Sequence, residues 1–255
     1  MKSLFYLSLL FCNTVLISTL EPDKNIDYLI LVNKKYKLPD DYESIVDLIT
    51  VKNFIQKNRT FEIERKTFEY YTLLRDKLLE DYNIQIELDS VYRSVKRQQE
   101  IWDEFMEEYG EEYTKAHVAV PGHSEHHTGL AVDICLVVNG TIIDNNEEMI
   151  AQKEIFEKIH ANLADYGFIL RYPEGKKYIT GYDYEPWHLR FVLVNNSIDI
   201  KNQGVTLEEY LHKDDERYTD EPTDNTDSTT DDGNSGYALD NKLIILLITI
   251  LGLIL

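Results

Sequence analysis

The spacing of apolar side chains predicts three helices, over residues 60–82, 96–109 and 146–166. In the first of these segments, apolar residues recur every three or four positions, which places them on one face of a helix. Gly167 follows the third segment, and a glycine at that position is typical of a helix end.

Short runs rich in β-branched and aromatic residues predict strands between and after these helices. They lie at residues 84–91, 130–138, 141–143, 168–172 and 187–193. Asn139-Gly140 is typical of a tight hairpin turn between two of these strands. Helices and short strands alternate within residues 25–213, and no internal repeat interrupts them. We therefore predict one α+β domain with a small, mainly antiparallel sheet and flanking helices.

Both ends of the chain differ in composition from this domain. Residues 1–20 begin with one positive charge and continue with a mostly apolar run, which predicts a signal peptide; a buried first helix is the alternative. Residues 214–242 are rich in acidic and small polar side chains, which predicts a disordered linker.

Residues 243–255 carry no charge. A helix of that length spans about 20 Å, less than the ~30 Å hydrocarbon core of a bilayer. The pattern favours a GPI-attachment signal, with a short membrane anchor as the alternative. Both readings predict a secreted domain that is tethered to the membrane.

The charge balance excludes some classes of partner. The chain has 46 acidic and 26 basic residues, a formal net charge of −20, so it would repel a nucleic-acid backbone. Its two cysteines cannot form a scaffold of several disulfides, and Cys135 lies in an apolar run where burial is expected. We expect a monomer.

Histidines and carboxylates gather at two places in the sequence. Three histidines fall within residues 123–127, in a loop that leads directly into a predicted strand containing Asp133. A carboxylate in an apolar strand is costly unless a partner or a metal compensates its charge. Glu185 and His188 stand at the start of another predicted strand. Two imidazoles and one carboxylate suit a catalytic zinc, although a surface cluster of histidines remains the alternative at this point.

The order of these residues resembles a known family. Ser-x-His-x-x-Gly-x-Ala-x-Asp over residues 124–133, followed by Glu-x-Trp-His over residues 185–188, is similar to the paired signature of the VanY-type D-alanyl-D-alanine carboxypeptidases. These belong to the zinc peptidases that include lysostaphin and the hedgehog signalling domain. The resemblance covers about residues 27–194, including the Tyr-Arg-Ser at 92–94; Val91 departs from it, because the family usually has glycine there.

The resemblance implies a role for each residue of the signature. The implied zinc ligands are His126, Asp133 and His188. Glu185 would be the general base, and Arg93 would stabilise the oxyanion that develops on the scissile carbonyl; a surface ion pair is the alternative for Arg93. The candidate substrate contacts are Ser94, Gln98 and Ser124.

The remaining histidines of this region are expected to have other roles. His123 and His127 are predicted to be solvated or to contact the ligands, and His160 to be a cation at a helix C-terminus.

The resemblance thus predicts a zinc-dependent carboxypeptidase that removes a terminal D-amino acid, D-alanine, from peptidoglycan stem peptides. Two enzymatic alternatives on the same scaffold are an L,D-carboxypeptidase and a D,D-dipeptidase. A non-catalytic binding or signalling module stabilised by zinc is a third alternative. Glu185 argues against this last one, because a structural zinc site has no need of a base beside it.

Overall fold

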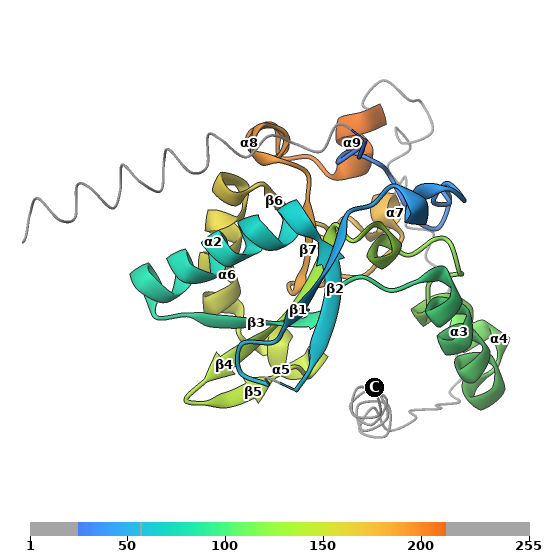
Figure 1. The fold of residues 1–255 in the computed structure, drawn as a ribbon, viewed down its shortest axis with the longest axis horizontal. Coiled ribbons are helices and arrows are strands. Elements are labelled where there is room, and N and C mark those ends of the chain that lie inside the picture. Colours follow the sequence, from blue (N-terminus) through green and yellow to red (C-terminus); the bar gives the residue numbers. More distant parts are fainter. Residues whose placement is uncertain (1–24, 57, 213–255) are drawn as a thin grey trace, which may run out of the picture. The chain divides into compact units, whose positions relative to one another are not determined.

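A computed structural model of the chain describes residues 25–56 and 58–212 (Figure 1). The predicted signal peptide (1–20), linker (214–242) and C-terminal tail (243–255) lie outside the described residues. Within the described part, none of the helices combines the length and apolar character that crossing a bilayer requires.

A central sheet of antiparallel strands organises the fold. Its members are β3 (Gln85–Ser90), β4 (Ala131–Val138), β5 (Thr141–Ile143), β6 (Phe168–Leu170) and β7 (His188–Phe191). The strand order is β3-β4-β7-β6, and β5 pairs with β4. The predicted strands and their antiparallel arrangement are therefore confirmed. Asn139 and Gly140 have φ values of 52° and 78°, and positive φ at both positions is what the predicted hairpin turn requires.

A second, two-stranded sheet corrects the first predicted helix. β1 (Leu48–Lys52) pairs antiparallel with β2 (Thr60–Glu64), and the helix α2 (Arg65–Tyr82) begins only after β2. The prediction of helix over residues 60–64 was therefore wrong. Glu64 explains the boundary, because its backbone is extended and its carboxylate accepts hydrogen bonds from the amides of Lys66 and Thr67.

The remaining helices are short, apart from one. They are α3 (Val95–Tyr109), α4 (Glu111–His117), α5 (Asn146–Ala151), α6 (Lys153–Asn162), α7 (Lys177–Thr180), α8 (Val194–Gln203) and α9 (Leu207–His212). Three 3₁₀ turns accompany them: η1 (Tyr42–Ser44), η2 (Glu125–Thr128) and η3 (Leu163–Tyr166). The helix predicted over residues 146–166 is divided into α5, α6 and η3, because the backbone of Gln152 leaves the helical region.

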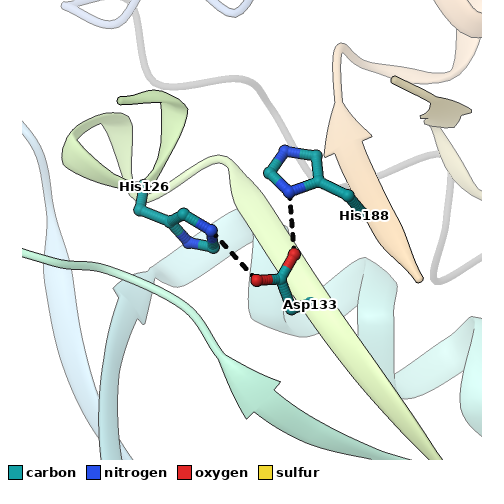
Figure 2. A group of neighbouring side chains, drawn as sticks. All are labelled: His126, Asp133 and His188. Atoms are coloured by element: carbon teal, nitrogen blue, oxygen red, sulfur yellow. Dashed lines mark ion pairs between the residues drawn. The ribbon is translucent and has the colours of Figure 1, made fainter. Parts of the chain in front are cut away.

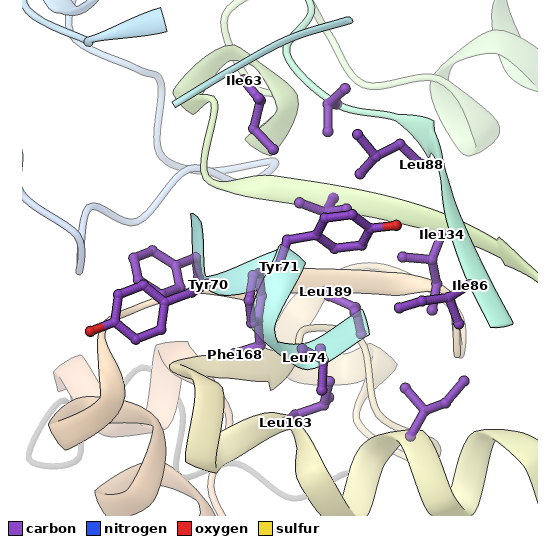
Figure 3. Close-up of a cluster of buried hydrophobic side chains, with 14 of the residues drawn as sticks. Ile63, Tyr70, Tyr71, Leu74, Ile86, Leu88, Ile134, Leu163, Phe168 and Leu189 are labelled. Atoms are coloured by element: carbon purple, nitrogen blue, oxygen red, sulfur yellow. The ribbon is translucent and has the colours of Figure 1, made fainter. Parts of the chain in front are cut away.

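One face of the central sheet is apolar, and the opposite face carries polar side chains where β4 and β7 pair. Side chains alternate along a strand, so every second residue of β4 and β7 enters the main core, as Figure 3 shows for Ile134 and Leu189. The helices α2 and α6 contribute to the same core, together with β3; its members include Tyr71, Leu74, Ile86, Leu88 and Phe156. The alternate positions of β4 and β7 carry Asp133, His188 and Arg190. The fold thus places polar side chains of two adjacent strands side by side.

Candidate metal centre

Asp133 and His188 are direct neighbours across the central sheet. They are partners in the antiparallel register of β4 and β7. Asp133 Oδ1 lies 2.7 Å from His188 Nδ1 (Figure 2). The hydrophobic pattern of the two strands therefore sets this contact, since a shift of one residue would turn either side chain into the core.

A glycine-dependent turn brings His126 to the same point. His126 lies in η2, and Gly129 ends this turn with φ 69°, a conformation that side-chain-bearing residues seldom adopt. A Cβ atom at Gly129 would also lie 3.2 Å from the backbone nitrogen of Glu64. After the turn, β4 runs back so that His126 Nε2 is 3.1 Å from Asp133 Oδ2.

These three side chains have the geometry of a metal site. One potential ligand atom from each of His126, Asp133 and His188 lies within 4.8 Å of the others, and the group is largely buried. Asp133 Oδ1 is buried and has no hydrogen-bond partner among the described residues, although His188 Nδ1 is close to it. Two imidazole nitrogens and a carboxylate oxygen are a common protein ligand set for catalytic zinc. The residues present therefore fit that ion.

Hydrogen bonds to the far nitrogens orient both imidazoles. His126 Nδ1 lies 2.7 Å from the carbonyl oxygen of Val91, and His188 Nε2 lies 3.3 Å from Oε2 of Glu125. The ring of Tyr172 packs on His188, with 4.7 Å between the ring centroids. Such partners fix which nitrogen of each ring carries a proton and which is free for a metal.

The charges of the group stabilise one another. Burial alone would lower the pKa of His188, but the Asp133 carboxylate beside it raises that pKa to about 10. Burial alone would raise the pKa of Asp133, but His126 and His188 hold it far below its usual range. A metal ion that binds here must therefore displace a proton, which makes its affinity dependent on pH.

Glu185 stands beside the group without belonging to it. Its Oε2 atom is 3.9 Å from His188 Nδ1, and its side chain is 29% exposed. A turn holds it in place, because its carbonyl accepts a hydrogen bond from the amide of His188. Burial raises the pKa of Glu185 to about 7. A carboxylate with this pKa is suited to accept a proton near neutral pH.

Two histidines differ from their predicted surroundings. His160 was predicted to be a cation, yet its Nε2 lies 2.9 Å from the carbonyl oxygen of Pro186, and burial lowers its pKa. A neutral ring that donates this bond supports the turn between Glu185 and His188. His127 is fully buried, which excludes the solvated alternative of its prediction, and its Nδ1 lies 2.6 Å from the carbonyl oxygen of Arg93.

Arg93, the predicted oxyanion-stabilising residue, is joined to the metal group through its backbone and to Gln98 through its side chain. The amide of Arg93 donates to the carbonyl of His126, and its guanidinium donates to Gln98 Oε1 at 2.9 Å and Ser90 Oγ at 3.2 Å. Arg93 is thus held by neighbours rather than by a surface ion pair. Gln98 is 1% exposed and also donates to the carbonyl of Ala119, so both ends of its amide are engaged.

The two predicted serine contacts differ in their surroundings. Ser94 caps α3, because its Oγ accepts a hydrogen bond from the amide of Arg97. Ser124 precedes η2, is 5% exposed, and makes no side-chain capping bond there. The roles of Ser94, Gln98 and Ser124 in substrate binding remain predictions.

Sequence reasoning missed four charged residues that are connected to the metal group. Glu125, Arg171, Arg190 and Glu208 have fully buried side chains that are joined by ion pairs. In the sequence each looks like an ordinary surface residue, and Glu125 is separated from Arg190 by 65 positions. The available signals were the positions of Arg171 and Arg190, because each lies inside a predicted strand.

Two buried imidazoles and a carboxylate with a second carboxylate beside them, on an antiparallel sheet, define a hydrolytic metal centre. The family model of VanY, D-alanyl-D-alanine carboxypeptidase, matches residues 62–194. The chain belongs to this family. It is 36% identical over 209 residues to a D-alanyl-D-alanine carboxypeptidase of Enterococcus faecalis, an alignment that covers 78% of this chain and 71% of the relative.

Solved structures of related enzymes share the fold. One is a mutant of the vancomycin-resistance D,D-pentapeptidase VanY in complex with Zn(II); it is 33% identical, with a TM-score of 0.60 over 73% of this chain and 99% of that one. Another is the LD-carboxypeptidase LdcB, which is also 33% identical, with a TM-score of 0.62 over 73% of this chain and 86% of that one. The predicted fold and family are both confirmed.

Proposed function

We propose that the chain is a zinc-dependent carboxypeptidase that removes a terminal D-alanine from peptidoglycan stem peptides. The observation that carries this proposal is the convergence of His126, Asp133 and His188, with Glu185 placed 3.9 Å from the nearest of them. Membership of the VanY family supports the reaction, and the Zn(II) complex of a structural relative supports the metal.

His126, Asp133 and His188 would hold the zinc ion. When bound, zinc supplies a Lewis acid that polarises the scissile carbonyl and makes water more acidic. Glu185 would accept the proton of the attacking water at its carboxylate and pass it to the leaving amine. The guanidinium of Arg93 would donate hydrogen bonds to the oxygen on which negative charge develops. Gln98 and Ser90 hold that guanidinium in a fixed orientation, so little reorganisation is needed during the reaction.

The stereochemistry of the cleaved bond distinguishes a D,D-carboxypeptidase from an L,D-carboxypeptidase, whereas a D,D-dipeptidase differs in the length of its substrate. Relatives of equal identity are named as a D,D-pentapeptidase and as an LD-carboxypeptidase. The D,D assignment here rests on the family match, whose model describes D-alanyl-D-alanine carboxypeptidases.

Product analysis tests the proposal. The zinc-loaded protein is incubated separately with a stem pentapeptide ending in D-Ala-D-Ala and with the tetrapeptide that lacks the last residue. We expect loss of one D-alanine from the pentapeptide and no change in the tetrapeptide, both read by mass spectrometry. Cleavage of the tetrapeptide alone would show an L,D-carboxypeptidase. A D,D-dipeptidase would leave both peptides intact and would instead hydrolyse free D-Ala-D-Ala to two molecules of D-alanine, which a third incubation measures. Absence of any product from protein with full zinc content would favour a non-catalytic module.

We further propose that the domain is exported and tethered to the outer face of a membrane. The apolar run within residues 1–20 and the uncharged residues 243–255 support this location, and both lie outside the described residues. Peptidoglycan is an extracellular substrate, so the location agrees with the proposed reaction.

A further inference from the structure

A network of buried ion pairs connects the proposed zinc ligand His188 to α9, the last described helix. Oε1 of Glu125 accepts hydrogen bonds from Arg171 at 2.6 Å and from Arg190 at 2.7 Å. Arg171 in turn donates to both carboxylate oxygens of Glu208 in α9, at 2.7 and 2.8 Å. The four side chains have no exposed surface.

The two residues at the ends of this network, Arg190 and Glu208, have further hydrogen-bond partners. Arg190 donates to the carbonyl oxygens of Tyr28 and Ile30, and Asn33 donates to Glu208 at 3.0 Å. Burying four charges is expensive, and a buried ion pair is by itself weak evidence for stability, since apolar side chains often serve as well. A fully satisfied polar network does, however, hold its members in one arrangement.

Among the described residues, the side chains of the network reach the metal group through the hydrogen bond between Glu125 and His188, and the backbone amide of Arg171 also donates to the carbonyl of His188. Glu125 Oε2 lies 3.3 Å from Nε2 of His188. A carboxylate can only accept here, so Nε2 carries a proton, and Nδ1, which faces Asp133, is the nitrogen left to bind a metal once its own proton is displaced. His126 differs from His188, because a backbone carbonyl, that of Val91, orients its ring.

We propose that Glu125 is a positioning residue for His188, and that Glu208 fixes Glu125 through Arg171. Glu208 follows residue 194, where the family model stops matching, and Tyr28, Ile30 and Asn33 precede its start at residue 62. The segments that flank the matched region are therefore part of the catalytic unit. This inference rests on the proposed role of His188 as a zinc ligand.

Zinc affinity measured on folded protein tests the inference. Full chains carrying Glu125→Gln or Glu208→Gln are titrated with zinc against a chromophoric chelator, at a temperature where circular dichroism shows each to be folded. Loss of an outer hydrogen-bonding partner of a metal ligand typically weakens metal binding about 10–100-fold. We expect an effect of that size for Glu125→Gln and a weaker effect in the same direction for Glu208→Gln.

The matched control is Glu209→Gln, one residue further along the same helix. Glu209 pairs with Lys176 and accepts a hydrogen bond from the amide of Thr206, and neither of these partners belongs to the buried network. Its removal should leave the zinc affinity within twofold of the parent. If Glu125→Gln does not fold, Glu208→Gln against Glu209→Gln decides the question.

A spectroscopic measurement separates positioning from a purely structural role. In zinc-loaded protein with ¹⁵N-labelled histidine, the Nε2–H signal of His188 should be visible, and it should shift or broaden in Glu125→Gln. The inference is overturned if the folded Glu125→Gln variant, or Glu208→Gln in its place, binds zinc as the parent does and leaves that signal unchanged. A parent chain that binds no zinc overturns the proposed function and this inference together, so the two failures are distinguishable.

Discussion

Glu185 has the position of a base rather than that of a ligand. It lies outside the group of three ligand atoms but 3.9 Å from one of them, and its burial raises its pKa to about 7. A carboxylate in that position can exchange protons with a water molecule at the metal without holding the metal itself.

Substitution of this base should separate catalysis from metal binding. We expect Glu185→Gln to keep full zinc content and to lose about 10²–10⁴-fold in kcat, the usual contribution of a general base. Metal analysis and steady-state kinetics on the same samples measure the two effects. Turnover within tenfold of the parent would show that Glu185 is not the base.

The pH profile should show the same carboxylate. Glu185 must be ionised to accept a proton, so kcat/KM should fall as the pH is lowered through its pKa. That pKa is about 7 without metal, and a neighbouring Zn²⁺ favours the charged form, so we expect the acidic limb below pH 7. The residual activity of Glu185→Gln should lack this limb. A parent profile that stays flat down to pH 4, with zinc still bound, would contradict the assignment.

Local sequence predicted the proposed zinc ligands better than the residues that hold those ligands in place. His126, Asp133 and His188 could be placed because they stand at fixed positions of a motif. Glu125 could not, because its partner Arg171 is 46 positions away and only the folded chain brings them together. The environment of His160 could not be predicted for the same reason, since its hydrogen-bond partner Pro186 is 26 positions away.

At the scale of the elements, the site depends on how η2 joins β4. Gly129 makes this junction with a positive φ, and a side chain there would press on the first turn of α2 through Glu64. The junction sets the distance between His126, before it, and Asp133, after it.

A methyl group at this junction should cost both stability and zinc affinity. A residue other than glycine in the left-handed region costs about 1–2 kcal/mol, and in Gly129→Ala the close contact with Glu64 adds to that cost. Gly140→Ala is the matched control, because Gly140 has φ 78° and open space around its Cβ position. Denaturant unfolding and zinc titration should show a larger loss of stability for Gly129→Ala and a loss of zinc affinity for that variant alone. Equal losses in both variants would show that the junction does not shape the site.

The strands were predictable and the start of α2 was not. In β4 an almost continuous run of apolar residues is typical of a buried strand, and in β7 apolar and polar residues alternate. The positions of Phe61 and Ile63 are compatible with a strand and also continue the helical spacing of α2. The pairing of β2 with β1 determines that this segment is a strand. Because that pairing is not local, the hydrophobic pattern could not show it.

At the scale of the whole molecule, the catalytic unit is larger than its motifs. The carboxylate of Glu208 in α9 and the carbonyls of Tyr28 and Ile30 complete the hydrogen bonds of two buried arginines. The chain on either side of the family match therefore contributes to the surroundings of the site.

The tether belongs to the same scale and remains a prediction. Residues 243–255 are uncharged and, as a helix of about 20 Å, shorter than a bilayer core. We expect phosphatidylinositol-specific phospholipase to release active protein from intact cells of the source organism. Recovery of a membrane-bound chain with an intact C-terminal peptide ending in Leu255 would show a plain membrane anchor and leave the catalytic proposal untouched.

Zinc titration of metal-free protein during peptide cleavage tests the central claim most directly. Release of D-alanine from the pentapeptide should be absent without metal and should rise linearly with zinc to a plateau at one equivalent. The His126→Ala, His188→Ala double variant should neither bind that equivalent nor release D-alanine. Full activity of the metal-free parent, or full zinc content in the double variant, would contradict the account.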